Sequence, residues 1–136
     1  MKIRNRARSS SLFLLELIIA ILFFSIASAV CVQFFVKSHT MSQDSKNLNL
    51  AVNECSSIAE IVQTSDSSRE ALREISMEYP DIKTDSNKCV INLETYSIYT
   101  DFTSDNGLIT CTMDASYPES KDSFYHLEVK HNVQKQ

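Results

Sequence analysis

The sequence is poor in the residues that build tight loops and catalytic sites. Its 136 residues include one glycine, two prolines and no tryptophan. A chain with a single glycine cannot form a glycine-rich phosphate-binding loop, and there is no nucleophile motif of the G-x-S-x-G type. A Cys-x-x-Cys pair is also lacking, and His126 and His131 stand five apart on a predicted strand, hence on opposite faces. We therefore expect no enzyme activity, no cofactor and no metal site.

Residues 11–36 form the one long apolar run, SLFLLELIIAILFFSIASAVCVQFFV. The twenty residues 17–36 carry no charge, and at 1.5 Å per residue a helix of this length spans the ~30 Å hydrocarbon core of a membrane. Glu16 lies near the start of the run, and a carboxylate at the bilayer centre costs about 2.5 kcal/mol or more. Glu16 therefore either pairs with a cation or is solvated at the level of the lipid headgroups.

A basic leader precedes this run. Residues 1–11 contain Lys2, Arg4, Arg6 and Arg8, no acid, and end on the small residue Ser11. Residues 12–17 then read Leu-Phe-Leu-Leu-Glu-Leu. Over residues 2–36 this pattern resembles the N-terminus of type IV pilins and type II secretion pseudopilins. Two positions depart from the family pattern: Ser11 replaces the usual glycine, and Gln33 stands where many pilins have a proline.

The resemblance implies a set of processing steps and partners. A prepilin peptidase would cut between Ser11 and Leu12 and methylate the new amine of Leu12, so that Glu16 becomes the fifth residue of the mature chain. In a filament, Glu16 would pair with the amino terminus of a neighbouring subunit. The implied function is that of a structural subunit, a minor pilin or pseudopilin of a pilus, secretion or competence filament. The implied partners are sister pilin-like subunits, the prepilin peptidase, membrane lipid and, indirectly, an assembly ATPase and platform protein.

Two other fates of the N-terminus stay open. The protein is either an uncleaved single-pass anchor for an outer binding module, or a secreted module released after Ala29, because Ala27-Ser28-Ala29 meets the rule for signal-peptide cleavage. A lipoprotein site at Cys31 is disfavoured, since Val30 is large for the position that precedes a modified cysteine.

The charge distribution orients the chain. Of its 13 basic residues four lie in the leader, and of its 17 acidic residues only Glu16 precedes position 37, so residues 37–136 carry nine basic and sixteen acidic residues, a net charge of −7. We expect no nucleic-acid partner. The positive-inside tendency predicts a single-pass protein of the cell membrane with a cytoplasmic N-terminus and an extracytoplasmic C-terminal domain, and a surface filament after assembly.

The hydrophobic periodicity predicts an α+β fold. Residues 12–63 read as one helix, a membrane or filament-core half (12–36) and an amphipathic continuation (37–63), and residues 64–136 as an extracytoplasmic α+β domain. The capping box Ser67-x-x-Glu70 begins a second helix. Residues 81–88 read as a polar connection, and residues 89–93, 96–102, 108–116 and 124–133 as strands, with a hairpin turn at residues 104–107. The amphipathic half of the helix would cover a three- or four-stranded antiparallel sheet, as in pilins.

Side chains in this outer part offer few candidate sites. Cys89 and Cys111, both on predicted strands, are the first choice for a disulfide in an oxidising compartment; the alternative is that these cysteines and Cys55 are small buried core residues. Asp101, Asp105 and Asp114 flank the predicted hairpin, but their spacing is incomplete for a calcium loop, so we expect solvated turn residues.

Overall fold

The computed structural model describes residues 4–133, and side chains from Ser10 onward. The chain divides into two compact units, one ending at Gln43 and the other beginning at Asp44. Helix α1 (Arg4–Thr64) is continuous through both units. Its interior contains neither glycine nor proline, so no residue type interrupts the backbone hydrogen bonds. The predicted helix 12–63 is confirmed, but it begins earlier, at Arg4 within the predicted leader, and ends one residue later, at Thr64.

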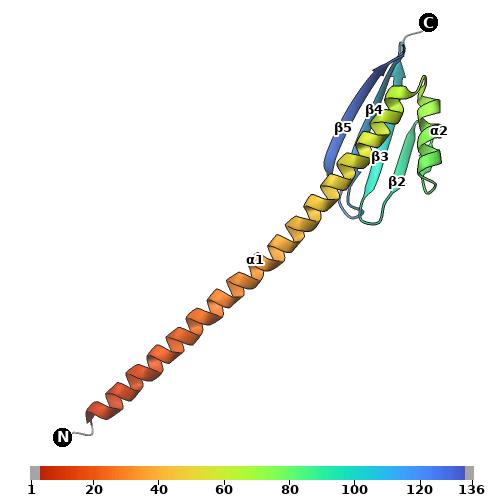
Figure 1. Cartoon of the computed structure of the whole chain (residues 1–136). Helices are drawn as coiled ribbons and strands as arrows, with labels where there is room; N and C mark the ends of the chain where they lie inside the picture. Colours follow the sequence, from red (N-terminus) through yellow and green to blue (C-terminus); the bar gives the residue numbers. More distant parts are fainter. Residues whose placement is uncertain (1–3, 134–136) are drawn as a thin grey trace. The chain divides into compact units, whose positions relative to one another are not determined.

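The second unit contains one antiparallel sheet (Figure 1). Its strands are β1 (Lys83–Asp85), β2 (Lys88–Asn92), β3 (Ser97–Asp105), β4 (Leu108–Ser116) and β5 (Ser123–Asn132). They follow one another in the order β1-β2-β3-β4-β5, so the sheet is a meander of consecutive strands. The expectation of three or four strands was wrong by one, because β1 lies in residues 81–88, which were predicted to be a polar connection. All three of its side chains are exposed, so the sequence carries no apolar alternation there.

A two-residue turn, Asn106-Gly107, joins β3 to β4. Both residues have positive φ, 50° and 84°, which the two-residue turns of twisted hairpins require. Gly107 also accepts a hydrogen bond from the Val133 amide to its carbonyl oxygen, 2.8 Å, and a Cβ at this position would lie 3.3 Å from the Val133 carbonyl oxygen. The only glycine of the sequence therefore stands where the backbone conformation and the neighbouring chain both favour it.

Helix α2 (Ser68–Glu78) begins with the predicted cap. Ser67 is the N-cap residue, and its hydroxyl accepts a hydrogen bond from the Glu70 amide, 3.2 Å. The Glu70 carboxylate in turn accepts one from the Asp66 amide, 2.9 Å, so one free donor of the helix start and the amide just before the cap residue are both satisfied. The helix buries Ala71, Leu72 and Ile75, with its acidic residues on the exposed side.

The core of the second unit lies between the helices and one face of the sheet. Residue 51 and the positions after it on α1 supply one wall, α2 supplies a second, and alternate residues of β2–β5 supply the floor (Figure 1). The fully buried side chains include Ile58, Ile75, Ile98, Phe102, Ile109 and Met113. The fold is thus α+β, with the end of a long N-terminal helix packed on a small antiparallel sheet, the architecture that the resemblance to pilins implied.

Candidate functional site

The apolar part of α1 has no covering within the first unit. Every described side chain from residue 10 to residue 43 is exposed. Large apolar side chains dominate this surface; those of Phe23, Phe24 and Phe35 are 72%, 71% and 77% exposed. Among the described residues, α1 is the one helix long and apolar enough to cross a membrane. A contiguous apolar surface of this size needs lipid or protein around it.

Glu16 lies on this apolar helix with its side chain exposed. No hydrogen bond or ion pair joins it to another described side chain of the same helix. The bond between Ser11 and Leu12, the predicted cleavage point, lies inside α1, and the Leu12 side chain is 66% exposed. The three residues that the pilin resemblance singles out are therefore close together on one helical segment, with Glu16 one turn after Leu12.

The cysteines of the second unit are core residues. Cys55, Cys89 and Cys111 are at most 1% exposed, and all are free thiols in the structure. Cys89 on β2 lies opposite Thr100 of β3, whereas Cys111 on β4 lies opposite Phe102, two residues further along β3. Second-neighbour strands are about 9.6 Å apart, beyond the 4.4–6.8 Å between Cα atoms that a disulfide spans. The first-choice disulfide between Cys89 and Cys111 is therefore not formed, and the alternative assignment to the core describes these residues.

Burial sets the acidity of these thiols. It raises the pKa of Cys55 from 9.0 to about 11, with the charges of Glu54 and Asp114 acting in the same direction. It raises the pKa of Cys111 to about 12, with Cys89 and Cys55 contributing. Desolvation also raises the pKa of Cys89, opposed by the hydroxyl of Thr100. Thiols of this kind stay protonated at neutral pH and are poor nucleophiles and poor metal ligands.

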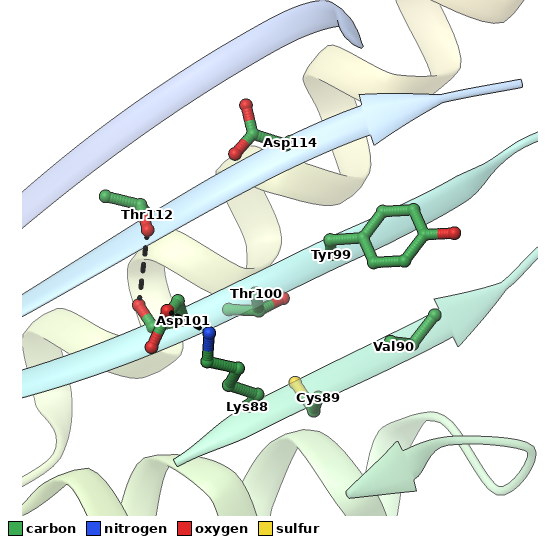
Figure 2. A pocket seen from close by; sticks show the side chains of 8 residues that line it. All are labelled: Lys88, Cys89, Val90, Tyr99, Thr100, Asp101, Thr112 and Asp114. Carbon is green, nitrogen blue, oxygen red and sulfur yellow. Dashed lines mark hydrogen bonds and ion pairs between the residues drawn. The ribbon is translucent and has the colours of Figure 1, made fainter. Parts of the chain in front are cut away.

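The sheet face that the helices leave uncovered carries a shallow depression of about 290 Å³ (Figure 2). Side chains from β2, β3 and β4 line it, and Tyr99, which is 49% exposed, is its aromatic component. Lys88 pairs with Asp101 at 3.0 Å, and Thr112 donates a hydrogen bond to the Asp101 carbonyl oxygen at 3.5 Å. The depression is thus lined by apolar and polar groups together, and its charged side chains are largely matched by near neighbours.

The three aspartates of the hairpin do not converge on a metal-sized space. Asp101 pairs with Lys88, Asp114 pairs with Nδ1 of His126 at 2.6 Å, and Asp105 is exposed at the end of β3. Among the described residues no group of three histidine, cysteine or carboxylate side chains is placed to hold a metal ion. His126 is exposed on the outer face and His131 half-buried on the inner face, in the alternation that the sequence predicted.

Two tyrosine contacts were not anticipated from the sequence. The Tyr79 hydroxyl donates a short hydrogen bond to Glu54, which ties the end of α2 to α1, and burial together with this bond raises the pKa of Tyr79 strongly. The Tyr117 hydroxyl donates to Asp44 at 3.1 Å and accepts from the Asn47 amide at 3.4 Å. The residues of each contact lie 25 to 73 positions apart, so no local pattern in the sequence could have revealed them.

Comparisons with protein-family models, with curated proteins and with solved structures found no match to this chain. The features that point to a function are those of the chain itself, above all the exposed apolar helix and the carboxylate within it.

Proposed function

We propose that this protein is a structural subunit of a pilin-like filament, a minor pilin or pseudopilin that assembles through residues 12–36 of α1. The observation that carries the proposal is one carboxylate, Glu16, on an otherwise apolar and fully exposed helix that is long enough to cross a membrane. The helix also ends in an α+β domain of the kind that pilins carry, which supports the same assignment.

The physical role of Glu16 is to make assembly selective. In a low-dielectric environment an unpaired carboxylate is heavily penalised, whereas a carboxylate paired with a cation is tolerated. Cleavage between Ser11 and Leu12 creates a new amine one helical turn before Glu16. We propose that the amine of a neighbouring copy is the cation that pairs with Glu16 in the assembled filament. Pairing between copies therefore fixes their register more than it adds stability.

The proposal includes an orientation and a set of partners. The leader, residues 1–11, lies in the cytoplasm, where a prepilin peptidase removes it, and the domain that begins after the span is extracytoplasmic. An assembly ATPase and platform protein act from the cytoplasmic side, and sister pilin-like subunits and lipid surround the helix. The function is structural and involves no catalysis.

Intact mass and N-terminal sequencing of the protein from its native membrane test the processing step. We expect a chain that begins at Leu12 with a methylated amine. A chain that retains Met1 would instead make it an uncleaved single-pass anchor, and a chain that begins at Val30 would make it a secreted module. In either of those cases the depression around Tyr99 becomes the first place to look for a ligand.

Replacement of Glu16 tests the pairing step. We expect Glu16→Ala to be cleaved but to lose incorporation into filaments, and Glu16→Gln to behave in the same way because the amide cannot neutralise an amine. Glu60→Ala is the matched control, since Glu60 is an exposed carboxylate of the same helix within the second unit. Normal filament incorporation of Glu16→Ala would count decisively against the proposal.

A further inference from the structure

The turn between β3 and β4 contains the one asparagine of the sequence that precedes a glycine. The seven other asparagines precede residues with larger side chains. Asparagine loses its amide most readily before glycine, because no side chain on the next residue hinders the approach of that residue's backbone nitrogen. Asn106 is exposed, and no hydrogen bond joins its carboxamide to another described residue. Its chemical surroundings are therefore those of a deamidation site.

The reaction at such a site needs no reagent other than water. The backbone nitrogen of Gly107 loses its proton and attacks Cγ of Asn106. The new C–N bond closes a succinimide ring, and the side-chain nitrogen leaves as ammonia. Water then breaks one of the two C–N bonds of the ring, which gives either aspartate or isoaspartate. The net change is the loss of one ammonia and the gain of one water, and in isoaspartate the backbone runs through the former side chain.

The native turn holds the two reacting atoms apart. Asn106 and Gly107 have φ of 50° and 84°, as in the type I′ turn of a two-residue hairpin. The first central residue of that turn has a ψ of about +30°, which places the Gly107 nitrogen nearly opposite the Asn106 Cβ around the Cα–C bond. Closure of the ring needs the two atoms on the same side of this bond. The reaction therefore requires the turn to open.

Two sets of contacts keep the turn closed. The sheet register pairs Asp105 with Leu108 on either side of the turn. The Val133 amide, which follows β5, donates a 2.8 Å hydrogen bond to the Gly107 carbonyl oxygen. The end of a hairpin can open locally at a lower free energy than the whole domain unfolds, so the turn opens without loss of the core.

We propose that Asn106 is a conformationally gated modification site, converted to aspartate or isoaspartate only when the end of the β3–β4 hairpin opens. This proposal is independent of the proposed filament function. Conversion adds a negative charge beside Asp105, in a part of the chain, residues 37–136, whose net charge is already −7. Isoaspartate also lengthens the backbone, so a two-residue turn no longer fits the register of the strands. The modified chain therefore keeps a permanent record that its hairpin has opened.

Timed deamidation of the full-length protein in mild detergent tests the site and its gate. The protein is held in alkaline buffer with or without urea. Mass spectrometry of proteolytic peptides then measures conversion at each asparagine, and methyl transfer by an isoaspartyl methyltransferase measures isoaspartate. We expect Asn106 to react first in urea, and to react at least about tenfold more slowly in the native protein. Asn87 is the matched control, an exposed turn residue that precedes Lys88 and should stay intact in both samples.

Replacement of Val133 tests what holds the gate closed. Val133→Pro removes the amide that donates to Gly107, so Asn106 should react about threefold faster or more in the native protein, with no change in urea. Val133→Ala keeps this amide and should leave the native rate close to that of the unchanged protein. Thermal unfolding of both variants shows whether the domain is still folded. If Val133→Pro unfolds it, the comparison of the unchanged protein with and without urea still decides.

Three results would overturn the proposal. The first is equal rates at Asn106 in the native protein and in urea, which would mean that the turn protects nothing. The second is faster conversion of another asparagine in urea, which would mean that the site lies elsewhere. The third is a folded Val133→Pro protein that reacts no faster than Val133→Ala, which would mean that the contact with Gly107 does not hold the turn.

Discussion

Helix α1 runs through two regions of the chain that differ in the exposure of their apolar side chains. In residues 10–43 every described side chain is exposed, whereas the same helix buries Ala51, Cys55, Ile58 and Val62 in the second unit. The backbone is helical in both, so helix formation does not explain the difference. The second region has an apolar stripe of helical period and its own sheet and helix to cover it, while residues 12–36 of the first are apolar on every side of the helix. One region completes its folding within the chain, and the other depends on a medium or partner outside it.

Separation of the two regions should have the largest effect, and that effect should be on solubility. Residues 44–136 expressed alone should be a soluble, cooperatively folded domain, because the whole buried core belongs to the second unit. The full chain should require detergent or lipid. Size-exclusion chromatography and thermal unfolding followed by circular dichroism measure both. An aggregated or unfolded fragment would show that the first region contributes to the core, contrary to the comparison.

Removal of one phenylalanine from each region should show the difference between the regions as a difference in the free energy of unfolding. Phe102 is 1% exposed in the core, so Phe102→Ala should lower the free energy of unfolding by about 3–5 kcal/mol. Phe24 is 71% exposed, so Phe24→Ala should change the unfolding of the second unit by less than about 0.5 kcal/mol. Urea unfolding of the two full-length variants in detergent compares them directly. Similar losses in both would mean that the exposed helix supports the fold.

Within the second unit, loss of the contact between α2 and α1 should lower the free energy of unfolding by an intermediate amount. Tyr79→Phe removes a hydroxyl that donates to the half-buried carboxylate of Glu54, which should cost about 1.5–3 kcal/mol. Tyr99→Phe is the control, since the Tyr99 hydroxyl has no described partner on the open sheet face. Thermal unfolding of both variants should separate them, and equal stabilities would show that the Tyr79 contact contributes nothing.

The buried thiols should have the smallest effect of all on stability at neutral pH. In alkali, their ionisation should lower the free energy of unfolding. Burial raises the pKa of Cys55 from 9.0 to about 11, so the native state holds this proton more tightly than the unfolded state. Stability is therefore unaffected below about pH 9 and falls as pH rises from 9 towards 11. A maleimide should label no more than one thiol, Cys31, in the native protein at pH 7, and all four in denaturant. Fast labelling of Cys55, Cys89 or Cys111 would mean that the core opens readily.

Local patterns in the sequence predicted most of the fold. The capping box at Ser67, the Asn106-Gly107 turn and the two-residue alternation in β5 after Phe124 all correspond to observed features. These signals are local, because a cap, a turn or a strand face is set by residues a few positions apart.

Long-range features escaped the sequence reasoning. The choice of Cys89 and Cys111 as a disulfide failed because it requires the strand order and register, which place β3 between the two residues. Strand β1 was missed because a short, exposed edge strand has no apolar side chain to reveal it. The ties from Tyr79 and Tyr117 to α1 were missed for the same reason as the register: they depend on how distant segments meet.

Strand β5 is an edge strand of the sheet, with no strand paired to its outer side among the described residues. An edge strand of ten residues can pair with a strand of another molecule, and such pairing leads to amyloid-like aggregation. His126, Glu128 and Lys130 are exposed along this strand, and charged residues of mixed sign oppose such pairing. Copies crowded together by contacts between their apolar helices could therefore keep their outer domains as separate, soluble bodies instead of merging them into one continuous sheet.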